Sequence, residues 1–270
     1  MADWGKIGSR GSVEDRRSFG PIAGGISLTG VVVLLLFNIL TGGTPEDVLT
    51  QLNEIPVEQQ LGASKEAFEG EDSYEVFAAT VLGSNNEMWA KAFEKDGKTY
   101  SPPKLVLFRS ATESSCGTAT SNVGPHYCPL NETIYLDETF FDELKSRFGA
   151  EGGDVAEAYV ISHEVAHHAQ NKLGILEEVR SNDQSIKLEL QADCFAGLWA
   201  NSIKDLDVLG PGEIGEAMDA ASAVGDDRIQ EKVTGQVNPE SWTHGSSDER
   251  VSWFNKGYNE GVLSSCDTFR

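Results

Sequence analysis

The most prominent feature of the hydrophobic pattern is a run of 28 residues without a charged side chain, from Ser18 to Pro45. Its centre, residues 26–40, is strongly apolar and has no polar face. About 20 apolar residues suffice to cross a bilayer as a helix, so we expect one transmembrane helix over residues 22–41. A cleaved signal peptide and a buried core helix are the alternatives. The run lacks a small-residue cleavage site and is long for a core helix, which favours an uncleaved anchor.

After the apolar run, the pattern predicts short strands followed mainly by helices. Residues 104–108 and 133–136 have the continuous apolar character of buried strands that could be neighbours in one sheet. Helical spacing is found at 73–92, where residues 83–86 could interrupt it, at 139–148, and over most of the chain beyond. These elements predict an α+β fold, mainly helical with a small β-sheet. The expected divisions are a head at 1–21, the transmembrane helix at 22–41, a linker at 42–73 and a catalytic domain at 74–270.

The distribution of charge gives the predicted membrane helix an orientation. The chain has 21 basic and 43 acidic side chains and a formal net charge of −22. Four of the basic residues precede the apolar run, and the next one is Lys65, so the head is expected in the cytoplasm and the acidic domain outside it. We therefore expect a protein of the bacterial inner membrane with a periplasmic domain. So acidic a domain has the wrong sign for binding nucleic acid.

The four cysteines agree with an extracytoplasmic domain, because disulfides persist outside the reducing cytosol. Three pairings are possible. We favour Cys116 with Cys128, which closes a short loop rich in Ser, Thr and Gly, and Cys194 with Cys266, which would tie the C-terminus to an internal helix. Four reduced, buried thiols are the alternative.

The segment 153–174 contains the strongest candidate for chemistry, an H-E-x-x-H pattern inside a predicted helix. Asp154 and Glu157 are expected to form a capping box at its start, and Gly174 to end it. His163 and His167 are four residues apart and therefore lie on one helical face, where both imidazoles can bind one cation. Glu164 is rotated by about 100° from His163, outside the metal shell but within reach of water there. It is the candidate general base. His168 points away and is expected to support a ligand or to lie on the surface.

A third ligand is expected from the predicted helix at 186–200. Glu189 and Asp193 are four residues apart, so they share one face. We expect Glu189 to bind the metal and Asp193 to accept a hydrogen bond from the far nitrogen of a ligand imidazole. A solvated pair of carboxylates is the alternative, and the apolar residues around them argue against it. Cys194 faces another way and is expected to form a disulfide.

The H-E-x-x-H pattern followed by E-x-x-x-D resembles the gluzincin class of metallopeptidases, and more closely the neutral zinc metallopeptidase family of bacterial single-pass membrane proteins. The resemblance covers nearly the whole chain and rests on residues 12–17, 124–129, 134–137, 163–168, 189–197, 225–230, 243–247 and 250–254. Ala166 and Ala169 stand where relatives are expected to have Gly and Val, changes that do not touch the ligands.

The resemblance implies zinc bound by His163, His167 and Glu189, with Glu164 as base. Similar peptidases also use a later histidine to stabilise the oxyanion, which implies His244, in the loop before a last helix capped by Ser246 and Glu249. That histidine could instead only cap the helix. Tyr135 is a weaker candidate for the same role, and His126 is expected to be structural.

We therefore expect a membrane-anchored, zinc-dependent peptidase that hydrolyses peptides or proteins through a metal-activated water. The strand at 104–108 or the one at 133–136 could pair with an extended substrate. One alternative is an envelope scaffold in which zinc clamps the two helices without catalysis. Another is an amidase that acts on cell-wall peptides.

Overall fold

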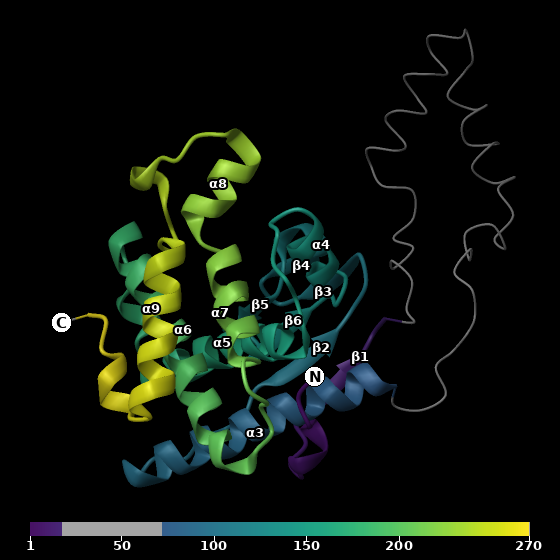
Figure 1. The fold of residues 1–270 in the computed structure, drawn as a ribbon. Helices are drawn as coiled ribbons and strands as arrows, with labels where there is room; N and C mark the ends of the chain where they lie inside the picture. Colours follow the sequence, from purple (N-terminus) through teal and green to yellow (C-terminus); the bar gives the residue numbers. More distant parts are fainter. Residues whose placement is uncertain (18–71, 270) are drawn as a thin grey trace, which may run out of the picture.

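The computed structural model describes residues 1–17 and 72–269 and confirms a mainly helical α+β fold with small sheets. In Figure 1 the helices α6 and α9 lie side by side, the strands lie on the other side of the molecule, and α3 runs along the bottom. The helices are α3 (Ser73–Lys95), α4 (Phe140–Ser146), α5 (Asp154–Leu173), α6 (Asn182–Ser202), α7 (Ile214–Ala223), α8 (Asp226–Thr234) and α9 (Ser247–Glu260). The strands are β1 (Val13–Asp15), β2 (Lys104–Leu107), β3 (Ala111–Ser114), β4 (Gly117–Thr120), β5 (His126–Cys128) and β6 (Thr133–Leu136).

The main sheet has the order β1-β2-β6-β5. The two predicted strands are β2 and β6, which pair in parallel with Leu105 opposite Ile134, as expected for neighbours. Both are interior strands, so the prediction that one of them offers a free edge is wrong. The edges of this sheet are β1, parallel to β2, and β5, antiparallel to β6. The strands β3 and β4 form a separate hairpin.

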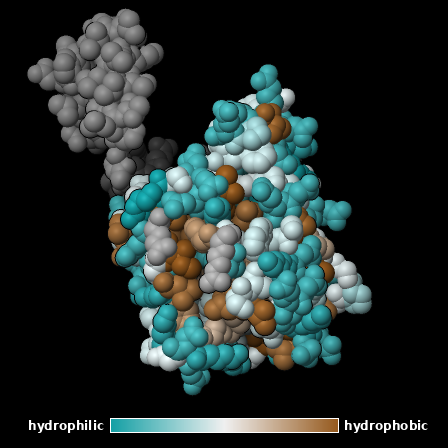
Figure 2. Space-filling view, turned by 90° about the vertical axis from the view of Figure 1, so that its left-hand side faces the viewer, coloured by the Kyte–Doolittle hydropathy of each residue, from teal (hydrophilic) through white to brown (hydrophobic). Residues whose placement is uncertain are grey.

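The hydrophobic core lies between the sheet and the central helices α5 and α6, where Trp89, Trp199 and Tyr159 are almost fully buried. The closest helix contact is between α6 and α9, and two glycines permit it. A Cβ atom on Gly197 would lie 2.0 Å from the Phe254 carbonyl oxygen, and one on Gly257 would lie 1.9 Å from that of Cys194. This contact brings α9 against α6, the helix of the predicted ligand Glu189. Outside the core, hydrophilic side chains cover most of the face in Figure 2.

Local signals for helix ends are confirmed at two termini and wrong at one. Gly174 ends α5 in the left-handed conformation, and Ser246 and Glu249 form the predicted capping box of α9. The α3 helix continues through residues 83–86 without a break. At the start of α5 the predicted capping box does not form, because the Asp154 carboxylate instead accepts hydrogen bonds from the Ala2 amide and the Trp4 indole.

Both predicted disulfides are present. Cys116 bonds to Cys128, joining the turn between β3 and β4 to the end of β5, and Cys194 bonds to Cys266. The second bond attaches the short C-terminal helix η7 (Leu263–Cys266) to α6. Among the described residues, no cysteine is free.

The N-terminal segment, residues 1–17, is part of the domain. Strand β1 extends the main sheet, and Gly83 of α3 allows Arg10 to pass so closely that a Cβ atom there would lie 2.6 Å from the Arg10 amide nitrogen. Arg17 is buried and pairs with Asp15 and Asp72, at 2.7 and 2.9 Å. Arg17 is one of the basic residues from which a cytoplasmic head was predicted. In the structure its ion pair with Asp72 instead holds the N-terminal segment against the domain.

This packing disagrees with the predicted topology. Strands of one sheet lie in one compartment, whereas a single crossing between Arg17 and Asp72 would separate β1 from β2. The predicted span at 22–41 and nearly all of the linker at 42–73 lie outside the described residues. Within the described ranges, none of the helices has the length and apolar character needed to cross a membrane.

Candidate active site

The two predicted ligand helices bring their side chains together as expected. The Nε2 atom of His163 lies 3.1 Å from one carboxylate oxygen of Glu189, and that of His167 lies 3.4 Å from the other. One ligand atom from each residue can be chosen so that all three lie within 4.8 Å of one another. His163 and Glu189 come from different helices, α5 and α6, so the cluster depends on the packing of these helices.

A hydrogen bond fixes each ligand imidazole through its Nδ1 atom. Asp193 accepts from His163 at 2.9 Å, which is the predicted role of Asp193. The side-chain oxygen of Gln170 lies 2.8 Å from Nδ1 of His167 and accepts a hydrogen bond from it. The side-chain nitrogen of Gln170 donates to the Leu188 carbonyl oxygen and to the Gln191 side chain, which orients the Gln170 oxygen toward His167. A proton on each Nδ1 leaves both Nε2 atoms free for a cation. Gln170 is three residues after His167, a spacing that could have predicted the contact.

The buried carboxylate of Asp193 is balanced by Arg250 of α9. The guanidinium donates to both Asp193 oxygens, at 2.8 and 3.0 Å, and Tyr159 donates its hydroxyl to one of them at 2.5 Å. Asp193 is 0 % exposed and Arg250 is 4 % exposed, so this bidentate pair is shielded from water. Burial raises the pKa of Asp193, but the charges of Arg250 and His163 lower it further, so the group is a carboxylate. The sequence assigned no role to Arg250, although it lies in a segment of the resemblance, or to Tyr159, because both meet Asp193 only in the folded chain.

The charge and chemistry of the cluster suit zinc. Two imidazole nitrogens and one carboxylate oxygen form a ligand set found in catalytic zinc sites. Burial would lower the pKa of His163, but Asp193 and Glu189 raise it to about 10. The carboxylates of Asp193 and Glu189 thus give the site a negative potential. This potential favours a proton on His163 and would equally attract a divalent cation.

The cluster lies in a cleft of about 580 Å³ that contains the other predicted catalytic residues, Glu164 and His244. Glu164 is only 7 % exposed, yet its carboxylate forms no hydrogen bond or ion pair within the described part of the chain. The walls are mostly apolar and come from the β5 region, from the start of α4, from α5 and the turn after it, and from the end of α7 and α8. They include Pro125, Pro129, Phe140, Val160, Leu176, Val224 and Ile229. A larger hollow, of about 900 Å³, lies between the N-terminal segment, α3 and η7 and contains none of the predicted site residues.

His244 is held at the cleft by Asp226, a residue of the segment 225–230 to which the sequence assigned no role. One oxygen of Asp226 lies 3.1 Å from Nδ1 of His244. The other accepts hydrogen bonds from the amides of Thr243, His244 and Gly245. His244 itself is half exposed, and its Nε2 atom makes no hydrogen bond with the described residues.

The three remaining candidates have structural positions. Tyr135 is buried in β6 outside the cleft, and its hydroxyl accepts a hydrogen bond from Asn131. His126 stacks on the Tyr135 ring with centroids 5.4 Å apart and lines the cleft. His168 is 0 % exposed and is not among the clustered metal ligands. It lies neither on the surface nor beside a ligand carboxylate, but contacts β5 instead.

Comparisons with known proteins give one family and several relatives without known function. The model of the family described as "Putative neutral zinc metallopeptidase" matches residues 2–269. The uncharacterized protein YpfJ of Escherichia coli (strain K12) is 41 % identical over 275 residues, which cover 96 % of this chain and 95 % of that protein. The uncharacterized protein Rv2575 of Mycobacterium tuberculosis (strain H37Rv) is 45 % identical over 185 residues, or 63 % of each chain. No solved structure matches significantly.

Proposed function

The chain belongs to the neutral zinc metallopeptidase family, and on this premise we propose that it is a zinc-dependent peptidase that hydrolyses peptide bonds in the cleft between β5 and α5. The observation that carries the proposal is the convergence of His163, His167 and Glu189 within 4.8 Å of one another, in a cleft that also contains Glu164, whose carboxylate has no partner among residues 1–17 and 72–269.

Each side chain then has a distinct role in hydrolysis. Zinc held by the three ligands would supply a Lewis acid that polarises a carbonyl group and makes water more acidic. Glu164 accepts a proton from the attacking water and later donates it to the leaving amine. His244, as the imidazolium whose Nδ1–H donates to Asp226, donates from Nε2–H to the developing oxyanion. Asp193 and Gln170 keep the two ligand imidazoles in the tautomer that binds metal.

The edge strand β5 is the proposed binding site for the substrate backbone. Among the strands of the described residues it pairs with β6 alone, and residues 124–127 line the cleft. An extended peptide can therefore add to the outer side of β5 through main-chain hydrogen bonds. Peptides with apolar side chains suit the apolar walls, and profiling of protein and cell-wall peptides would distinguish a protease from an amidase.

Removal of the metal tests catalysis against a purely structural role for zinc. We expect a chelator to abolish peptide hydrolysis and added zinc to restore it, while the circular dichroism spectrum stays that of a folded domain. The fold should survive because two disulfides and a large core hold the helices. Hydrolysis and circular dichroism are measured on the same samples. Unfolding on chelation, in a protein that hydrolyses no peptide even with zinc, would instead support the scaffold alternative.

We further propose that the domain works outside the cytosol, attached to the inner membrane by the apolar run, with residues 1–17 on the same side as the domain. The disulfides support an oxidising compartment, and the pairing of β1 with β2 supports a common side.

Labelling of single introduced cysteines tests this placement. A membrane-impermeant maleimide is expected to label both Asp3→Cys, in the N-terminal segment, and Glu177→Cys, on the domain surface, in intact spheroplasts. Both parent side chains are exposed, so accessibility in the folded chain is matched. If Asp3→Cys is labelled only after lysis while Glu177→Cys is labelled before it, the N-terminal segment and the domain lie on opposite sides of the membrane. That result would support a single membrane crossing and contradict the proposed placement.

A further inference from the structure

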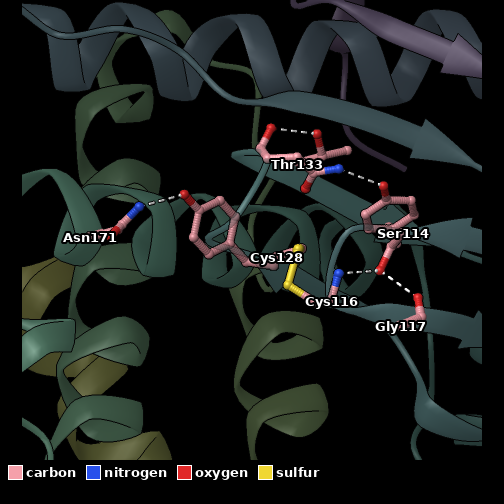
Figure 3. The surroundings of a disulfide bond; sticks show 9 residues. Ser114, Cys116, Gly117, Cys128, Thr133 and Asn171 are labelled. Atoms are coloured by element: carbon pink, nitrogen blue, oxygen red, sulfur yellow. Dashed lines mark hydrogen bonds between the residues drawn. A yellow bond between two sulfur atoms is a disulfide. The ribbon is translucent and has the colours of Figure 1, made fainter.

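Strand β5 is fixed at two consecutive residues, on opposite sides. The Tyr127 hydroxyl lies 3.0 Å from Nδ1 of His168 and accepts a hydrogen bond from Asn171 at 2.9 Å, and both partners belong to α5. Cys128, the next residue, is bonded to Cys116 in the turn between β3 and β4. Figure 3 shows Asn171 on one side and the disulfide on the other.

The hydrogen bonds around His168 have a defined direction. The Ser101 carbonyl oxygen, 2.7 Å from Nε2 of His168, can only accept, so Nε2 carries the proton. Nδ1 is then an acceptor and receives the Tyr127 hydroxyl proton. Asn171 donates in turn to the Tyr127 oxygen, so every polar atom at this contact is satisfied. His168 is fully buried, with the rings of Tyr100 and Tyr127 packed edge-on against it.

One helix therefore holds both the metal ligands and the strand that lines the cleft. His168 directly follows the ligand His167, and Asn171 lies one turn further along the same helix. A shift of α5 relative to β5 would break the contact with Tyr127. The distance between the metal ligands and the edge of the sheet is thus set by this contact.

From this arrangement, and resting on the proposed peptidase function, we propose that His168 and Asn171 are positioning residues that act through Tyr127. They hold β5 so that an extended peptide lying along it brings its scissile carbonyl group to the metal site. The substrate class is then an extended polypeptide segment that occupies several residues of the edge strand, and a blocked dipeptide would not depend on the contact.

Steady-state kinetics of the full-length zinc-loaded protein test the inference, with an extended peptide of about eight residues and a blocked dipeptide as substrates. Tyr127→Phe and Asn171→Ala each remove hydrogen bonds to β5. Each is expected to raise KM for the extended peptide by up to about tenfold, since one hydrogen bond is worth about that factor. Its kcat, the kcat/KM for the dipeptide and the zinc content should change less than twofold.

Tyr135→Phe is the matched control, because it removes a tyrosine hydroxyl from the neighbouring strand β6 without touching α5. It should leave both substrates unaffected. Release of the other side of β5 by Cys116→Ser with Cys128→Ala should raise KM for the extended peptide in the same way. Asn171 is only half-buried, so its variant should fold even if the others do not.

Four results would overturn the inference. Equal losses for the long and the short substrate, or the same loss in Tyr135→Phe, would show a merely structural contact and would leave the peptidase function intact. Unchanged kinetics in the folded Asn171→Ala variant would show that the contact with Tyr127 does not position the substrate, and would also leave the peptidase function intact. A wild-type protein that cleaves neither substrate would overturn the peptidase function, and this inference with it.

Discussion

Glu164→Gln is expected to lower kcat for peptide hydrolysis by about three orders of magnitude while zinc remains bound. General acid and base groups contribute about 10²–10⁴-fold, and this substitution keeps the shape of the side chain while removing its basicity. Zinc should remain because Glu164 is not one of the three clustered ligands. The rate and the zinc content are measured on the same preparation.

Glu177→Gln is the matched control, because Glu177 is an exposed carboxylate outside the cleft. It should have wild-type activity. His244→Gln should lower kcat by about 10²-fold, typical of the loss of one oxyanion donor. Bound zinc with wild-type activity in Glu164→Gln would contradict the role of this residue as base.

Arg250→Met is expected to destabilise the metal-free domain by about 3–5 kcal/mol. The substitution leaves the carboxylate of Asp193 buried without its bidentate partner, and breaking a buried ion pair on one side typically costs about this much. Urea unfolding, followed by circular dichroism, gives the free energy of unfolding. A midpoint equal to that of the wild type would show that the ion pair does not stabilise the fold.

Two further variants separate the loss of the partner from the loss of packing. Arg250→Lys keeps the charge but cannot donate two parallel hydrogen bonds, so it should lie between the wild type and Arg250→Met. Arg250→Met combined with Asp193→Asn removes both charges, keeps an acceptor for Tyr159 and His163, and should recover much of the lost stability. If the double variant is as unstable as the single one, the cost lies in packing around α9 and not in the unpaired carboxylate.

The metal site could be predicted because its information is local. In an α-helix, residues four apart share a face whatever the rest of the fold does, so the pairs His163 with His167 and Glu189 with Asp193 define their own geometry. The caps of α9 and the end of α5 are local in the same sense. Strands β2 and β6 were also predictable, because both are buried over most of their length and so have continuous apolar sequences.

What the sequence did not reveal depends on contacts between distant segments. Asp154 caps no helix because Ala2 and Trp4 reach it from the other end of the chain. Arg250 meets Asp193 only because glycines let α9 approach α6 closely. Strand β1 has a mostly polar sequence, and it forms because its charged side chains find partners, such as Asp15 with Arg17. The basic residues that follow the strand, Arg16 and Arg17, resemble a topology signal when they are counted without their acidic partners.

The most direct test of the account is the zinc content of the purified protein after dialysis, measured by mass spectrometry for the wild type, Glu189→Ala and Glu177→Ala. We expect about one zinc ion per chain in the wild type and in Glu177→Ala, and almost none in Glu189→Ala. The reason is that the Glu189 carboxylate completes the ligand set begun by His163 and His167. Retention of a full zinc equivalent in Glu189→Ala would contradict the account.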